Sequence, residues 1–114
     1  MLKDVRIESR QVGDRVVIQV TGRLDAENAP IFETHCESWI SKGINNLIID
    51  AGDLAYVSSL GLRCFVAIGK RLQDRGGKLR VCRQTGLVKQ VFEITRLDSI
   101  FPPFESVETA LADR

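Results

Sequence analysis

Residues 47–82 read LIIDAGDLAYVSSLGLRCFVAIGKRLQDRGGKLRVC, and this stretch decides the fold. The unbroken apolar run at 47–49 is typical of a strand that is covered on both faces in the middle of a sheet. From Leu60 onward, apolar residues recur at helical spacing until the glycine pair at 76–77 ends the pattern. Residues 78–82 then alternate, which predicts a second strand. The stretch therefore predicts a strand–helix–strand unit of an α/β protein.

The residues before this unit predict a hairpin and a helix. Residues 4–9 alternate, residues 15–20 are rich in β-branched side chains, and a glycine-containing turn joins them, so we expect a β-hairpin. The next helix is expected to have Asn28 or Asp25 as its cap. It should end at 42–43, where a basic residue is followed by glycine.

The residues after position 82 complete the predicted order. They indicate a helix over 87–94, a short strand at 100–101 and a last helix over 106–112. The full order is then β-β-α-β-α-β-α-β-α. We expect an α/β fold with a single mixed β-sheet and helices packed on it, in one domain that spans residues 1–114.

The composition is that of a small globular protein. The chain has 114 residues, of which 44% are hydrophobic and 27% charged, and it contains no run of 18 apolar residues that could cross a membrane. The start of the sequence lacks the apolar core of a signal peptide. We therefore expect a cytoplasmic protein without membrane insertion.

The cysteines and the histidine do not suggest a cofactor. Cys36, Cys64 and Cys82 lie in apolar stretches without a C-x-x-C spacing, so buried free thiols are expected. His35 adjoins Cys36, but no carboxylates stand at a spacing that would complete a metal site, and we expect no metal. A phosphate-binding loop sequence is also lacking, because the glycine pair at 76–77 precedes a strand and not a helix.

The charge is unevenly distributed along the chain. Residues 1–57 hold 6 basic and 9 acidic side chains, whereas residues 58–114 hold 10 basic and 6 acidic ones. The basic residues gather between 63 and 89, where only Asp74 opposes them. This stretch could bind nucleic acid or an acidic partner, but a solvated helix face is the commoner meaning, and no direct nucleic-acid binding is expected.

Two serines stand where the strand region gives way to the helix. Ser58 or Ser59 can cap the helix, and Gly61 would let its first turn lie close to the sheet. A phosphate is also tolerated at a helix start, because its negative charge faces the positive end of the helix dipole. The nucleophile elbow of hydrolases requires glycine where Val57 stands, and His35 would be the sole available base, so no enzymatic activity is expected.

Residues 53–63, Asp-Leu-Ala-Tyr-Val-Ser-Ser-Leu-Gly-Leu-Arg, resemble the signature of STAS domains, the fold of bacterial anti-sigma factor antagonists. The resemblance extends to Gly-Arg-Leu-Asp at 22–25, to Gly-Gly-Lys-Leu at 76–79 and to residues 94–101. These four segments follow in order and cover nearly the whole chain. They agree with the order of elements derived from the residue pattern.

The resemblance implies a protein-binding switch. In this family the antagonist binds an anti-sigma factor that is also an ATP-dependent serine kinase, and binding frees a sigma factor. The kinase phosphorylates a serine at the helix start, which abolishes binding, and a serine phosphatase restores it. That serine aligns with Ser59. Because Ser58 stands where the family has an aspartate and Leu60 where it has a second hydroxyl residue, Ser58 is the alternative phosphorylation site.

The resemblance also suggests which residues contact the partner. It places Asp25 and Asp53 beside the serines, although either can instead serve a turn or a cap. The first helical turn would supply the rest of the surface, with Leu62 and Arg63 as the expected contacts besides Ser58, Ser59 and Gly61. The alternative function is a constitutive docking subunit of a larger assembly, such as a lipid-transport ATPase complex, in which the serine loop is only a docking surface.

Overall fold

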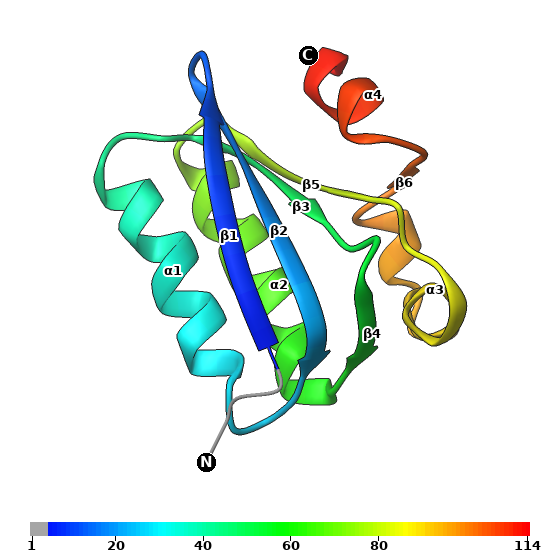
Figure 1. The fold of residues 1–114 in the computed structure, drawn as a ribbon. Helices are drawn as coiled ribbons and strands as arrows, with labels where there is room; N and C mark the ends of the chain where they lie inside the picture. Colours follow the sequence, from blue (N-terminus) through cyan, green and yellow to red (C-terminus); the bar gives the residue numbers. More distant parts are fainter. Residues whose placement is uncertain (1–4) are drawn as a thin grey trace.

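The computed structural model describes residues 5–114, which form six strands and four α-helices (Figure 1). Residues 1–4 lie outside the described part. These residues include the first position of the strand expected at 4–9 and the start of the sequence that was compared with a signal peptide. A 3₁₀ turn at Leu97–Ser99 follows α3. The elements are β1 (Val5–Val12), β2 (Arg15–Leu24), α1 (Ala29–Ser41), β3 (Asn46–Asp50), β4 (Leu54–Val57), α2 (Ser59–Asp74), β5 (Lys78–Cys82), α3 (Gly86–Ile94), β6 (Pro103–Phe104) and α4 (Val107–Ala112).

The strands form one mixed sheet, as the sequence predicts. Its order is β1-β2-β3-β5-β6, with β4 paired to the far end of β2. The hairpin of β1 and β2 is antiparallel, and all other pairs are parallel. The carboxyl ends of β2 and β4 therefore lie together at one end of the sheet, where α1 and α2 begin.

The predicted order of elements needs two corrections. Residues 54–57, to which the sequence pattern assigns no element, form β4, a strand of only four residues that pairs with β2 beyond a register shift. The last strand lies at 103–104 and not at 100–101. Phe101 is buried in the core at 3% exposure, whereas Ile100 is 59% exposed, so this apolar pair anchors a loop and does not form a strand.

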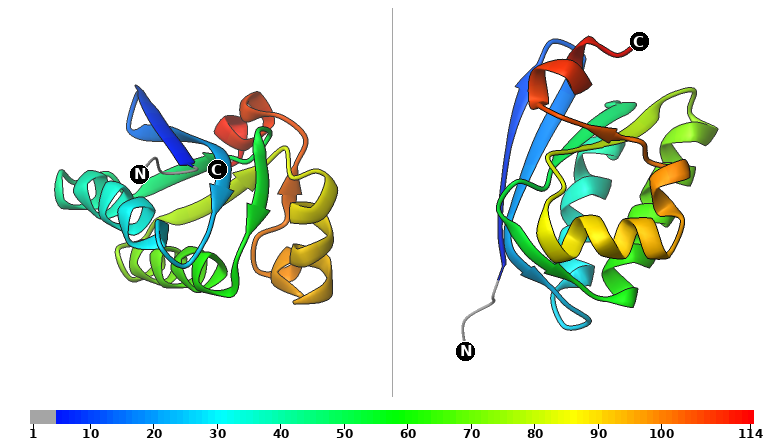
Figure 2. Two further views of the ribbon diagram at one scale, coloured as in Figure 1. Left: turned by 60° about the horizontal axis from the view of Figure 1, so that its bottom comes forward. Right: turned by 90° about the vertical axis from the view of Figure 1, so that its right-hand side faces the viewer.

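The helices cover the sheet unequally (Figure 2). Helices α1 and α2 pack on one face, where the larger hydrophobic core contains Val16, Ile18 and Val20 of β2. Helix α4 packs on the opposite face, where Val17 joins a smaller cluster with residues of β3, β5 and α4. Successive side chains of β2 thus point to opposite faces of the sheet, the even-numbered ones toward α1 and α2 and Val17 toward α4.

Phe65 holds α2 in the centre of the larger core. Its ring is fully buried and lies 5.2 Å from the ring of Phe32 on α1 and 5.6 Å from that of Phe92 on α3. The ring of Phe101 lies 6.4 Å away and closes the cluster from the loop before β6. Because one residue of α2 contacts three other segments, the start of α2 has a fixed position at the end of the sheet.

Candidate functional site

The site lies where β4 passes into α2. The amide of Ser58 donates to the carbonyl of Leu24 at 2.8 Å, which ties the joint to the end of β2. The hydroxyl Oγ of Ser58 accepts a hydrogen bond from the amide of Gly61 at 3.1 Å. Ser58 is therefore the N-cap of α2, which confirms the capping role expected for one of the two serines.

Gly61 allows the first turn of α2 to approach the sheet. The residue is buried, and a Cβ atom there would lie 2.8 Å from Cγ2 of Val57 and 3.2 Å from Cδ2 of Leu24. Any side chain at this position would push the helix start away from β2 and β4. The expected close packing at Gly61 is thus confirmed.

Ser59 has a different environment from its neighbour. It is the first residue of α2, its side chain is exposed, and its hydroxyl makes no hydrogen bond to any residue in the described range 5–114. The first turn of this 16-residue helix contains no acidic residue. The positive end of the α2 dipole, equivalent to about half an elementary charge, is therefore available to an anion on Ser59.

The two serines should respond differently to alanine substitution. Ser58→Ala removes the cap bond to Gly61 and is expected to lower the free energy of unfolding by about 1 kcal/mol. Ser59→Ala removes an exposed hydroxyl and should change that free energy by less than about 0.5 kcal/mol. Urea denaturation of both variants against the wild type measures the difference. Equal effects of the two substitutions would contradict the assigned cap.

Of the two carboxylates expected beside the serines, the structure brings only Asp25 to the joint. Asp25 directly follows Leu24, and its Oδ1 accepts from the amides of Glu27 and Asn28 at 3.0 Å, so the side chain stabilises the turn before α1. Asn28 occupies the cap position of α1, but its side chain bonds within this turn and does not cap the helix. Asp25 is thus a turn residue as well as a neighbour of Ser58.

Asp53 lies at the other end of β4. Five residue steps along this strand separate Asp53 from Ser58, which corresponds to about 16 Å. Its Oδ2 accepts a hydrogen bond from the side-chain amide of Gln19 at 3.2 Å, on the middle part of β2. The structure therefore does not bring Asp53 next to the serine pair, because the strand at 54–57 lies between them.

The exposed residues of the first helical turn differ in part from those expected. Arg63 is exposed, as predicted. Leu62 is half-buried and packs against the larger core, while Leu60 is 40% exposed. The apolar part of the surface beside Ser59 is therefore supplied by Leu60 more than by Leu62.

Sequence reasoning missed one pair of residues at this end of the sheet. The guanidinium of Arg23 lies over the ring of Tyr56, 4.2 Å from its centroid. The two residues are partners across β2 and β4. Because Leu24 and Val57 point into the larger core, the alternation of strands directs Arg23 and Tyr56 to the opposite face. Arginine and tyrosine are enriched in protein interfaces, and this pair extends the candidate surface.

The groups that a hydrolase would need do not meet at the serines. His35 contacts Ser9 of β1, with 3.1 Å between Nε2 and Oγ, and burial and the charge of Lys42 lower the pKa of its ring.

The three cysteines are free and buried, which confirms the expectation of buried free thiols. Burial raises the pKa of Cys64 to about 11 and that of Cys82 to about 12, so these thiols are protonated at neutral pH.

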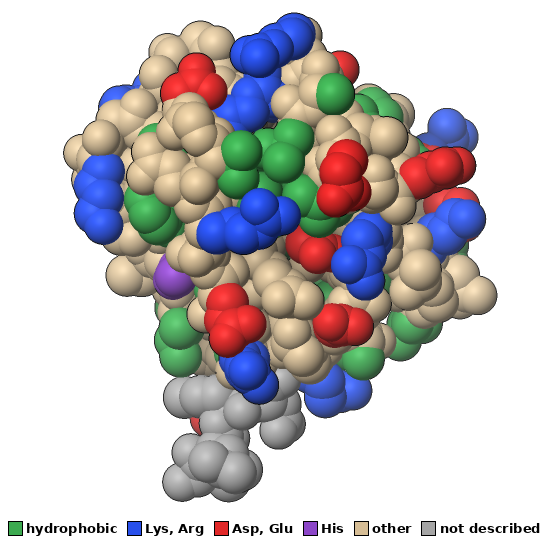
Figure 3. Space-filling model, turned by 45° about the horizontal axis from the view of Figure 1, so that its top comes forward, with side chains coloured by type: hydrophobic (Ala, Val, Ile, Leu, Met, Phe, Trp, Pro, Cys, Tyr) green, Lys and Arg blue, Asp and Glu red, His purple; other side chains and the backbone are tan. Residues whose placement is uncertain are grey.

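The basic stretch from 63 to 89 does not form a continuous surface. Four of its eight cationic side chains are ion-paired: Arg71 with Glu37, Lys78 and Arg80 with Asp113, and Arg83 with Asp50. On the face shown in Figure 3, basic and acidic side chains are interspersed. This arrangement favours the interpretation of the stretch as solvated surface over that of a nucleic-acid site.

The described residues 5–114 contain neither a cluster of metal-binding side chains nor a helix that could span a membrane. Within this range no three His, Cys, Asp or Glu side chains gather in a way that could hold a metal ion. None of the helices in the described range combines the length and the apolar character needed to cross a bilayer.

Comparison with known proteins places the chain in a family. The model of the STAS domain matches residues 6–110. The protein BtrV of Bordetella bronchiseptica is 31% identical over 108 residues, which are 95% of this chain and 93% of BtrV. The anti-sigma-B factor antagonist of Listeria monocytogenes is 32% identical over 84% of this chain and 83% of its own.

The fold is shared with solved structures. The anti-sigma factor antagonist SpoIIAA in its unphosphorylated form superposes with a TM-score of 0.82 at 18% identity, over 93% of each chain. The phosphorylated form of SpoIIAA from Bacillus superposes with a TM-score of 0.74 at 18% identity, over 94% of this chain and 97% of that one. With a family model that spans almost all of the sequence and a fold that agrees with it, this chain belongs to the STAS domain family.

Proposed function

We propose that the protein is an anti-sigma factor antagonist, a non-enzymatic protein that binds an anti-sigma factor and thereby frees a sigma factor. The names of its relatives support this function, since the Listeria protein is an anti-sigma-B factor antagonist. The partner surface comprises the exposed residues Ser59, Leu60, Arg63 and Arg23, together with the half-buried Asp25, Tyr56 and Leu62.

Phosphorylation of Ser59 is the proposed control of this binding. The observation that carries the proposal is the contrast between the two serines: Ser58 is engaged as the cap, whereas Ser59 presents a free hydroxyl at the positive end of α2. SpoIIAA, which has the same fold, has been solved with and without phosphate. The proposed enzymes are the anti-sigma factor itself, acting as a serine kinase, and a serine phosphatase.

The phosphorylation is tested by intact-mass analysis. Wild type, Ser59→Ala and Ser58→Ala are incubated with magnesium-ATP and soluble extract of the source organism. We expect one added phosphate on the wild type and on Ser58→Ala, and none on Ser59→Ala. A phosphate that is lost only from Ser58→Ala would move the site to Ser58.

The binding is tested by capture from the same extract. Immobilised wild type is expected to retain a protein that has an ATP-binding kinase domain and that also binds a sigma factor. Adding the antagonist to the purified complex of that protein with its sigma factor should release the sigma factor. A permanent partner in a transport assembly, together with no phosphate from an extract of verified kinase activity, would instead establish the constitutive docking subunit.

A further inference from the structure

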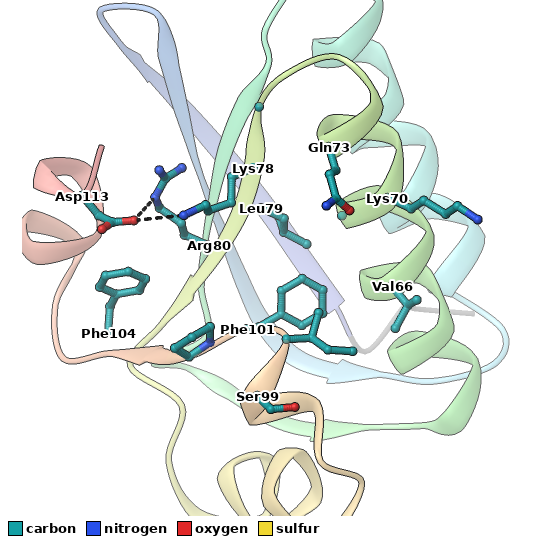
Figure 4. Close-up of a pocket in the computed structure, with 14 residues that line it drawn as sticks. Val66, Lys70, Gln73, Lys78, Leu79, Arg80, Ser99, Phe101, Phe104 and Asp113 are labelled. Carbon is teal, nitrogen blue, oxygen red and sulfur yellow. Dashed lines mark hydrogen bonds and ion pairs between the residues drawn. The ribbon is translucent and has the colours of Figure 1, made fainter.

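A groove of about 830 Å³ lies on the far side of α2 from α1 (Figure 4). One wall is α2 from its middle onward, with Val66, Gly69 and Gln73. The loop before β6 closes the groove at one end with Ile100 and Phe101. Its volume lies in the range of natural ligand sites. From Ser59 to Val66 the helix rises about 10 Å, so the groove is separate from the proposed switch.

The floor of the groove is a strand edge to which, before Val81, no further strand within residues 5–114 is paired. Lys78 donates to the carbonyl of Asn45, and the carbonyl of Cys82 accepts from Ala51, so the even-numbered residues of β5 bond on the β3 side. The odd-numbered residues face the other way, and there the pairing with β6 begins only at Val81. The N–H and C=O groups of Leu79 therefore face the groove without a neighbouring strand.

Proline explains why the chain does not close this edge itself. The next ladder bond beyond β6 would run from the amide of residue 102 to the carbonyl of Leu79. Residue 102 is proline and has no amide hydrogen, so the ladder stops at this point. An unpaired strand edge is a template on which an extended peptide can add as a further strand.

The two walls select different side chains. Toward α2 the surface is apolar, with the buried Leu79 and Phe101 and the exposed Val66 and Ile100. On the other face, Lys78 and Arg80 point toward Asp113 (Figure 4). The Oδ2 atom of Asp113 lies 3.7 Å from Nζ of Lys78 and 2.8 Å from Nε of Arg80. Lys78 and Arg80 bring two cationic groups and Asp113 one carboxylate to this wall, whereas the Lys70 side chain points away from the groove (Figure 4). An added strand would thus present apolar side chains to one wall and acidic ones to the other.

We propose that this groove binds an extended peptide segment of a partner protein, in which apolar and acidic residues alternate, by strand addition to β5 at Leu79. The inference goes beyond the Ser59 switch and does not depend on it. The segment would have its main chain bonded to Leu79, its apolar side chains between Val66 and Phe101, and a carboxylate beside Lys78.

The test is a titration of isotope-labelled full-length protein, followed by NMR, with a peptide of alternating valine and glutamate. We expect shifts at Leu79 and Ile100 and slower amide exchange at Leu79. Lys78→Ala is expected to weaken binding about fivefold, whereas Lys89→Ala, on the exposed side of α3, should not change it. Lys78 is largely exposed, so its replacement leaves the fold intact.

Two matched peptides test the two parts of the recognition. N-methylation of alternate peptide amides removes main-chain donors and should abolish binding if a strand is added. Replacing glutamate by lysine should weaken binding at least tenfold. The proposal is overturned if no shift occurs up to about 1 mM peptide, if the lysine peptide binds equally, or if the shifts map to β1. It is also overturned if Leu79 shifts with protein concentration alone, because the occupant is then a second copy of this chain.

Discussion

Phosphorylation of Ser59 is expected to weaken binding to the anti-sigma factor by about a hundredfold or more. Ser59 lies on the exposed first turn of α2, beside Leu60 and Arg63, so a partner that packs there covers its hydroxyl. A phosphate adds roughly two negative charges, which the partner surface would have to bury. In the free domain the same charges face water and the positive end of α2, so they cost little there.

The measurement is calorimetric titration of the captured partner with four forms of the antagonist. These forms are the wild type, the Ser59-phosphorylated protein, Ser59→Ala and Ser58→Ala. Ser59→Ala and Ser58→Ala should keep the wild-type affinity within about threefold, because neither adds charge. The urea midpoint of the phosphorylated protein should be equal to or above that of the wild type. An unchanged affinity after phosphorylation would contradict the switch, and a lowered midpoint would show that the phosphate acts by unfolding α2.

The parts of the fold that the sequence predicts have strong local periodicity. The hairpin, α1, β3, α2 and β5 all lie where alternation, helical spacing or an apolar run placed them. Strand β4 was missed because its four residues give too short a pattern, and because its pairing with β2 joins residues more than thirty positions apart. The last strand was misplaced because Phe101 is apolar for a tertiary reason, its contact with Phe65.

The site also combines residues that a local sequence pattern predicts with residues that only the tertiary fold brings together. The serines and Gly61 form a contiguous motif at a helix start, and such a motif can be read from the sequence. Helical spacing puts Leu60 on the face of Cys64, yet Leu60 is exposed because the first turn of α2 lies at the end of the sheet. The Arg23–Tyr56 contact requires the pairing of β2 with β4, which no local pattern reveals.

The largest loss of stability is expected from Gly77→Ala. A Cβ atom at Gly77 would overlap the main-chain carbonyl oxygen of Asn45, which accepts the hydrogen bond from Lys78 at 3.0 Å. The amide of Gly77 also donates to Leu72 at 2.8 Å, so the chain is held from both sides. Relief of the overlap would separate the starts of β3 and β5. We expect the free energy of unfolding to fall by about 3 kcal/mol or more, a large part of the 5–15 kcal/mol typical of a domain.

Gly52→Ala is the matched control for this prediction. Its Cβ atom would overlap the guanidinium of Arg83, which is the end of a flexible and partly exposed side chain. Arg83 can turn aside at the cost of its 3.4 Å contact with Asp50, so we expect a loss of about 1 kcal/mol. Neither glycine has a positive φ, which leaves the steric overlap as the difference between them. Urea denaturation measures the free energy of unfolding of both variants. Equal losses would contradict the prediction, because the junction of β3 and β5 would then yield as easily as a surface arginine. The β5 edge beside the groove would in that case not be rigidly held.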